Sequence, residues 1–153
     1  MKESFNILPF GLDKEEKHSF LLERLNNLTE HHLSKCFEYK LLMEKLGESK
    51  PLYSDLENVP FLPVRLFKYF DLLSVPRDDV IKTMTSSGTS KLNVSHIFLD
   101  KYTAELQVRI LSKIVSDFIG KKRLPMLEID TRSTVSDRKK FSARTAGILG
   151  FSI

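Results

Sequence analysis

The segment from Asp100 to Gly120 constrains the fold more than any other part of the sequence. Apolar side chains recur there at every fourth position, which is the spacing of one face of an α-helix. These residues are Leu106, Ile110, Ile114 and Phe118, with Leu111, Val115 and Ile119 beside them. The opposite side carries Glu105, Arg109, Lys113 and Asp117. Asp100 can cap the first turn and Gly120 can end the last one. An apolar stripe this wide predicts a helix that packs on a sheet.

Strand patterns flank this helix on both sides. Residues 81–85 alternate in character, and residues 94–99 follow with Ile97 and Leu99 on one face. After the helix, the apolar run 124–130 predicts a short buried strand that ends in Asp130. Strand, helix and strand in this order predict a right-handed parallel crossover, and ligands gather at the carboxyl ends of such strands. Residues 141–149 predict a last helix.

The N-terminal residues predict two helices that pack as a hairpin. Asp13 and Glu16 have the spacing of a capping box, so the first helix should start there and run to about Asn26. Asn26 and Asn27 are expected to interrupt it, and Thr29 to cap a second helix that ends at Gly47. The residues expected on one side of that helix are Leu33, Cys36, Phe37, Lys40, Met43 and Leu46. We expect His31 and His32 at the surface and Cys36 as a small buried hydrophobe.

Prolines change the character of residues 49–76. Pro51, Pro60, Pro63 and Pro76 interrupt an otherwise apolar, Phe-rich segment, so an extended backbone is expected, with one short helix after Pro63. Its apolar residues are expected to serve as core and linker. The predicted class is therefore α/β, with an N-terminal helical hairpin at residues 1–48. An incomplete mixed sheet with packed helices follows at residues 49–153, as a partial nucleotide-binding domain.

Composition excludes several classes of protein. Hydrophobic residues make up 41% and charged residues 29%, as in a globular domain, and no run is long and apolar enough to span a membrane. With one cysteine and no secretory signal, the cytoplasm is the expected compartment. The formal charge is +4, and basic residues gather between Lys121 and Arg144. Since no aromatic interleaving or reading motif accompanies them, we expect a solvated face or the rim of an anionic-cofactor site rather than nucleic-acid binding.

A hydroxyl-rich loop around Gly88 separates the first two predicted strands. Residues 85–90 are small and polar, and Gly88 allows backbone conformations closed to other residues. Such a loop can direct N–H groups and hydroxyls at a phosphate, or it can be an ordinary connection between strands. Neither common nucleotide fingerprint is present, since the sequence lacks both Gly-x-x-x-x-Gly-Lys-Ser/Thr and Gly-x-Gly-x-x-Gly. From the residues alone, both readings stay open.

Several segments in the right order resemble one family. Ser86-Ser87-Gly88-Thr89-Ser90 followed by Ser95-His96-Ile97-Phe98-Leu99-Asp100 resembles the acyl-protein synthetase (LuxE-type) family of bacterial luminescence operons. The segments 59–64, 127–130 and 141–144 match it too, so the similarity runs from about Asp13 to the C-terminus. The family belongs to the adenylate-forming ligases, whose hallmark is a Ser/Thr/Gly-rich loop around the phosphates of ATP.

This resemblance implies an activity and its partners. A long-chain fatty acid would react with ATP, with Mg²⁺ sharing the phosphate charge, to give an acyl-adenylate. The acyl group would then pass to a protein cysteine and on to an acyl-reductase protein. The residues implied to bind the ATP phosphates are Thr85, Ser86, Ser87, Gly88, Thr89, Ser90 and Lys91. No residue is assigned a catalytic or metal-binding role.

The sequence departs from the family pattern in two ways. Lys91 stands where most adenylate-forming ligases have a second glycine, and Asn93 stands near the usual position of their lysine. Family members are also more than twice as long, which predicts that the chain is the N-terminal portion of a synthetase and inactive alone. Cys36 does not match the acylated cysteine. The alternative is a truncated, non-catalytic α/β module or pseudoenzyme with a structural or partner-binding role.

Overall fold

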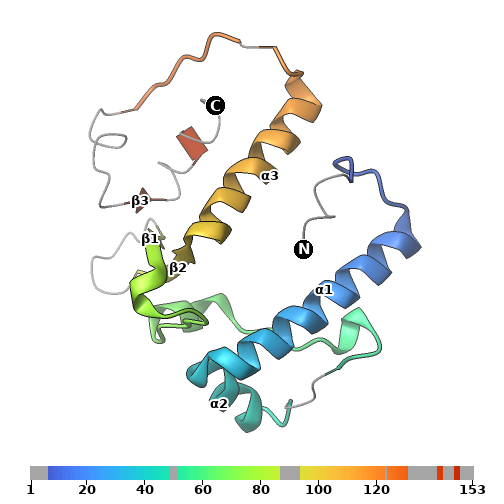
Figure 1. Cartoon of the computed structure of the whole chain (residues 1–153), viewed down its shortest axis with the longest axis vertical. Coiled ribbons are helices and arrows are strands. Elements are labelled where there is room, and N and C mark those ends of the chain that lie inside the picture. The colour runs from blue at the N-terminus through green and yellow to red at the C-terminus, as the bar shows by residue number, and fades with distance from the viewer. Residues whose placement is uncertain are drawn as a thin grey trace. The chain divides into compact units, whose positions relative to one another are not determined.

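The computed structural model describes residues 7–48, 52–86, 94–122, 124–130, 141–142 and 147–148. The chain divides into two compact units, Met1–Arg77 and Asp78–Ile153. Helices dominate the first unit, while the second combines strands with one long helix, so the predicted α/β class is confirmed (Figure 1). The predicted domain boundary after residue 48 stays a prediction.

Helix α1 (Lys14–Lys35) begins at the predicted capping box. The Glu16 N–H donates to Asp13 Oδ1 at 2.8 Å, and the Asp13 N–H donates to Glu16 Oε2 at 3.1 Å. The predicted interruption at Asn26 and Asn27 is wrong, because α1 continues through both residues and through Thr29. Asn26 is buried, and its side-chain amide bonds to the backbone of Tyr53 rather than to its own helix. An asparagine engaged in this way does not compete with the helical hydrogen bonds around it.

The helix break falls instead at Cys36, whose backbone is extended. Helix α2 (Phe37–Lys45) follows at once and packs beside the C-terminal end of α1, as Figure 1 shows. Gly47 lies just past its end at φ +72°, which agrees with its predicted role. Cys36 and Met43 are buried as predicted, but Phe37 is 74% exposed and Leu46 is also exposed. Within α2, Phe37 and Met43 are six positions apart, which is about 240° around the helix, so their side chains point to different sides.

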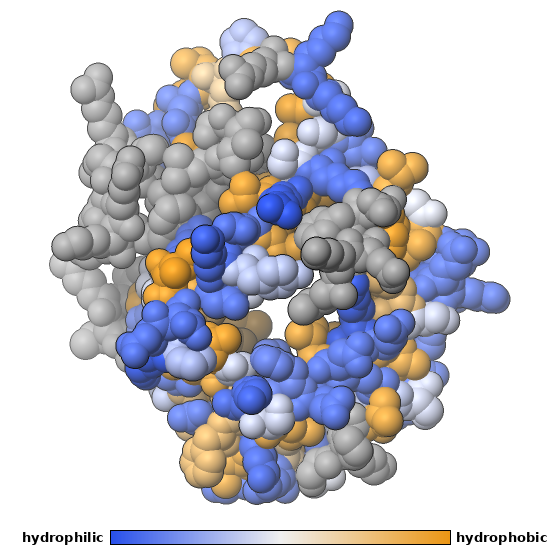
Figure 2. Space-filling view, viewed as in Figure 1, coloured by the Kyte–Doolittle hydropathy of each residue, from blue (hydrophilic) through white to orange (hydrophobic). Residues whose placement is uncertain are grey.

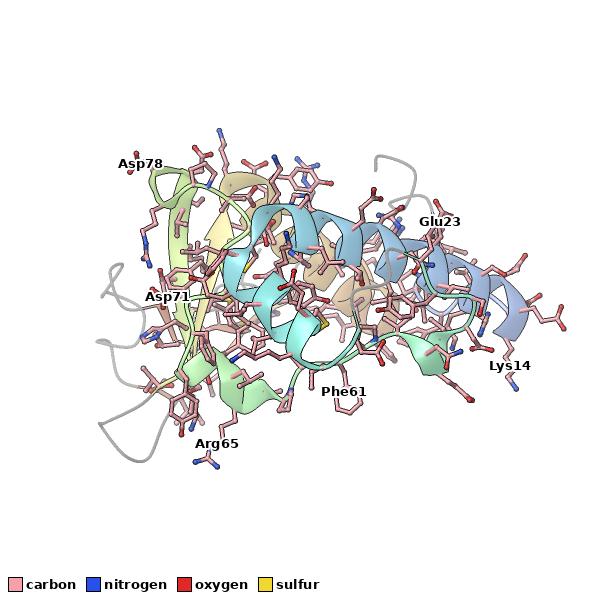
Figure 3. All side chains as sticks on the ribbon, turned by 90° about the horizontal axis from the view of Figure 1, so that it is seen from below. Lys14, Glu23, Phe61, Arg65, Asp71 and Asp78 are labelled. Carbon is pink, nitrogen blue, oxygen red and sulfur yellow. The ribbon has the colours of Figure 1, made fainter. Side chains whose placement is uncertain are left out.

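The proline-rich segment forms short 3₁₀ turns, η2 (Leu56–Asn58) and η3 (Val64–Lys68). The short helix predicted after Pro63 is confirmed. The expectation that the apolar residues of this segment form core is not confirmed for Phe61, which is 85% exposed, or for Val64, which is also exposed. Figure 3 shows Phe61 pointing away from the ribbon. An extended backbone turns successive side chains to opposite sides, so Leu62 is half-buried while Phe61 faces outward.

A mixed sheet forms the start of the second unit. Strand β1 (Val80–Thr85) follows the turn η4 (Arg77–Asp79) and pairs antiparallel with β2 (His96–Asp100). Strand β3 (Phe141–Ser142) pairs parallel with β1 on its other side, which gives the order β2-β1-β3. The predicted mixed sheet and both predicted strands around Gly88 are therefore confirmed.

Helix α3 (Lys101–Ile119) has the predicted ends. Asp100 Oδ1 accepts the Thr103 N–H at 2.8 Å, and Gly120 ends the helix at φ +82°. The prediction that this apolar face of α3 covers the sheet is wrong in part. Ile110, Ile114 and Phe118 are exposed, with Phe118 at 72%, whereas Leu111 and Val115 on the adjoining side are half-buried.

The elements predicted after α3 differ from those observed. Residues 124–130 form no strand, and Leu127 and Ile129 are 87% and 92% exposed. Asp130 therefore does not lie at the end of a strand, and the predicted crossover to 124–130 is wrong. The parallel neighbour of β1 is β3, at residues predicted to start a helix. Residues 147 and 148 are helical, while 143–146 and 149 lie outside the described part.

Candidate functional site

The structure describes only the beginning of the predicted phosphate loop. Thr85 is the last residue of β1 and Ser86 follows it. The other predicted contacts, Ser87, Gly88, Thr89, Ser90 and Lys91, lie outside the described residues. The chain resumes at Val94 and enters β2 at His96. The observed hairpin therefore brings Thr85 and Ser86 next to Ser95 and His96, but does not test the loop's role.

Two serines close the base of this loop. The Ser86 N–H donates to the Ser95 carbonyl oxygen at 3.3 Å, and the Ser95 N–H donates to Ser86 Oγ at 3.1 Å. Ser95 is buried, whereas Ser86 is exposed. We call this pair the Ser86–Ser95 neck. The Ser86 hydroxyl oxygen accepts the backbone N–H here, and its O–H proton is the donor that it could offer to a phosphate oxygen.

Strand register places four side chains on one face beside the neck. Thr85 pairs directly with His96, and Thr83 pairs directly with Phe98. Directly opposed residues of antiparallel strands share a face, with their Cβ atoms about 5 Å apart. The His96 and Phe98 rings stack at 6.3 Å with an angle of 26° between their planes. His96 was not among the predicted site residues, although the alternation of strand 94–99 placed it opposite the face of Ile97 and Leu99.

A lysine lies on the other face of β1. Lys82 pairs with Leu99, which is buried, and Lys82 itself is half-buried. Burial lowers the pKa of its ammonium group. Because residues alternate between faces along a strand, Lys82 points away from the face of Thr85 and His96.

The far end of the hairpin carries an acidic cavity of about 500 Å³. Its lining residues are Asp78, Asp79, Ile81, Asp100, Lys101, Tyr102 and Glu105. The Asp100 carboxylate caps α3, and its hydrogen bonds to Thr103 lower the pKa of the Asp100 carboxyl. Four carboxylates around one opening repel phosphate, so this cavity is a poor match for the predicted ligand.

The first unit contains its own polar contacts. Nδ1 of the half-buried His32 lies 2.6 Å from Ser74 Oγ, which corrects the prediction of a surface residue. Burial, and secondarily the neighbouring His31, lowers the pKa of the His32 imidazole. His31 is exposed as predicted. Cys36 is buried to 2% exposure, which suits the predicted apolar role and not that of an accessible nucleophile.

Two kinds of feature are absent from the described residues. In the described ranges, no three His, Cys, Asp or Glu side chains are placed to hold a metal ion. Among the helices that the structure describes, none has the length and apolar character needed to cross a bilayer.

Comparison with known proteins gives one match. The model of a family described as "Acyl-protein synthetase, LuxE" matches residues 3–151, nearly the whole chain. No curated protein and no solved structure matches the sequence.

Proposed function

Because this chain belongs to the acyl-protein synthetase family LuxE, we propose that it supplies the phosphate-binding part of an ATP-dependent fatty acid–protein ligase. The family consists of synthetases, which are enzymes that depend on ATP, so a site for the ATP phosphates is expected. In this proposal, the residues from Thr85 to Lys91 bind the β- and γ-phosphates of ATP. The residues that would contact the phosphates are Thr85, Ser86, Ser87, Gly88, Thr89, Ser90 and Lys91.

The observation that carries this assignment is the Ser86–Ser95 neck at the end of an antiparallel hairpin. The neck anchors both ends of the Ser/Thr/Gly segment to paired strands, with backbone and side-chain hydrogen bonds. A loop held at its base loses less entropy when it closes on a ligand, so its N–H groups and hydroxyls can bind phosphate oxygens at lower cost. Gly88 would let the backbone approach closely, and Lys91 would offset phosphate charge.

The proposed reaction has two steps. A carboxylate oxygen of a long-chain fatty acid attacks the α-phosphorus of ATP, and the bond to the β-phosphate oxygen breaks, so pyrophosphate leaves with the electron pair. A cysteine sulfur then attacks the acyl carbon of the adenylate and AMP leaves, while the thiol loses its proton. Donors fixed on the β- and γ-phosphates stabilise the charge that develops on pyrophosphate.

Mg²⁺ would add to this charge stabilisation when it enters with the nucleotide. Magnesium commonly keeps several waters and binds through substrate phosphates, so the proposal assigns no residue of this chain as its ligand. The acceptor cysteine is also not assigned, since Cys36 is buried. An acyl-reductase protein is the proposed recipient of the acyl group.

The test measures binding of Mg·ATP to the whole chain by calorimetry, followed by pyrophosphate release when a long-chain fatty acid is added. The motifs identified in the chain concern the phosphates alone, so we expect binding without formation of acyl-adenylate. Failure to bind Mg·ATP would contradict the proposal and favour a non-catalytic α/β module.

A further inference from the structure

The His96 imidazole lies beside the Ser86–Ser95 neck. His96 is half-buried and follows Ser95 directly, at the first position of β2. In the part of the chain that the structure describes, neither ring nitrogen of His96 makes a hydrogen bond or ion pair. Polar groups withdrawn from water are normally hydrogen-bonded. A half-buried imidazole that makes no hydrogen bond within the described residues can therefore still bind a ligand.

The position of this ring is set by its neighbours. The Phe98 ring stacks on it at 6.3 Å, and the strand register holds it directly opposite Thr85. Both neighbours lie on β-strands and not in a loop, which restricts the directions in which the imidazole can point. A donor fixed in this way loses little freedom when it binds a ligand.

The charge distribution along the hairpin favours an anion at the His96 end. Among the described residues, the four nearest the neck on this face are Thr83, Thr85, His96 and Phe98, and none of these carries a carboxylate, while Asp100 follows on the same face at the far end of β2. The acidic residues Asp78, Asp79 and Asp100 gather at the opposite end. At about 3.3 Å per strand residue, the two ends lie roughly 13 Å apart. That distance exceeds the Debye length of about 8 Å at physiological salt, so the acidic end repels an anion at the neck only weakly.

We propose that the His96 imidazole donates a hydrogen bond to a phosphate oxygen of the bound triphosphate, next to the Thr85 hydroxyl. This inference rests on the proposed function, and it adds a phosphate-binding residue outside the Ser/Thr/Gly segment. An imidazole N–H supplies a directional donor that hydroxyls alone cannot replace, and hydrogen bonds to charged groups are among the stronger ones.

The first test compares three variants in binding to inorganic tripolyphosphate and to Mg·ATP. His96→Phe keeps a ring that can stack on Phe98 but removes the donor, so we expect both ligands to bind about ten- to a hundredfold more weakly. His96→Gln keeps an N–H donor and should lose about threefold or less. His31→Gln removes an exposed imidazole of the other unit and should bind as the unmodified chain does. Thermal unfolding of each variant establishes that it is folded.

Two results would overturn the proposal. One is unchanged binding of tripolyphosphate by His96→Phe. The other is a loss confined to Mg·ATP, which would place His96 against the nucleoside instead of the phosphates.

A second measurement does not depend on how the variants fold. The chain has four histidines, so imidazole ¹⁵N resonances of the unmodified protein can be assigned one by one. Tripolyphosphate should shift the resonances of His96 and leave those of His18, His31 and His32 in place. If tripolyphosphate binds the unmodified chain but the resonances of His96 stay in place, the contact to His96 fails and the proposed function stands. If the unmodified chain binds neither ligand, both fail.

Discussion

Asn26 and Tyr53 form a closed pair of hydrogen bonds across 27 positions of sequence. The Asn26 side-chain N–H donates to the Tyr53 carbonyl at 2.9 Å, and the Tyr53 N–H donates to Asn26 Oδ1 at 2.8 Å. Both residues are buried. The asparagine amide thus replaces a strand neighbour for Tyr53, and it ties the proline-rich segment to the middle of α1.

Removal of this pair should destabilise the protein. Asn26→Ala leaves a buried N–H and a buried carbonyl of Tyr53 without partners, so the free energy of unfolding should fall by about 2–4 kcal/mol. Chemical denaturation monitored by circular dichroism measures the change. The adjacent Asn27 is exposed, and Asn27→Ala is the matched control, with an expected change within about 0.5 kcal/mol. Equal effects of the two variants would contradict the structural role of Asn26.

His32 should make stability depend on pH. Its pKa is lowered in the folded protein, first by burial and then by His31. The unfolded chain therefore takes up a proton at higher pH than the folded chain does. The stabilisation from the neutral imidazole is fully present above the ordinary histidine pKa of about 6.5 and is lost as pH falls toward the lowered value.

NMR titration of the His32 ring checks this origin. In the unmodified protein its midpoint should lie below the ordinary value. His31→Gln removes the like charge, so the midpoint should move upward yet stay below the ordinary value, because burial is the larger cause. A midpoint at the ordinary value in the unmodified protein would be inconsistent with a half-buried His32.

The cap of α3 predicts a third effect. Asp100→Ala removes the acceptor of the Thr103 N–H and should cost about 1 kcal/mol of unfolding free energy. Asp100→Asn keeps an acceptor and should cost much less at neutral pH. Because hydrogen bonds lower the pKa of Asp100, its contribution is present above the ordinary carboxyl pKa and lost as pH falls through the lowered value. The cap assignment fails if the alanine and asparagine variants are equally stable.

Local signals in the sequence predicted helix ends well. The caps at Asp13 and Asp100, and the glycines after α2 and α3, depend on residues within one turn of each other. The interruption predicted at Asn26 was wrong because the partner of that side chain lies far along the chain, where no local pattern reveals it. Helix propensity alone then favours a break that tertiary hydrogen bonds prevent.

Strand pairing shows the same limit. The sequence predicted the next strand at residues 124–130 and a helix from Phe141, whereas the structure pairs β1 with Phe141–Ser142. Apolar composition alone does not determine which later segment pairs with an earlier strand. Likewise, the periodicity located the apolar stripe of α3 but did not show which side of the stripe is buried. Figure 2 shows apolar side chains exposed among hydrophilic ones on the surface.

For the candidate site too, local sequence patterns predicted some features, and contacts between distant residues determined the others. The Ser/Thr/Gly segment and both strands around it could be read from sequence, because small polar residues between alternating runs are a local pattern. The position of Ser95 in the neck and that of His96 beside it could not, since they follow from the hydrogen bonds of the neck and from the register of Thr85 with His96.

The proposed function requires residues 85–91 to bind the phosphates of ATP. Calorimetric titration of Mg·ATP into the double variant Ser87→Ala with Gly88→Val tests it most directly, with Ser54→Ala, an exposed serine of the other unit, as the control. The double variant removes one hydroxyl donor and places a branched side chain where the backbone should approach the phosphates. We expect at least about tenfold weaker binding by the double variant and unchanged binding by the control. Equal affinity of the double variant and the unmodified chain would contradict it.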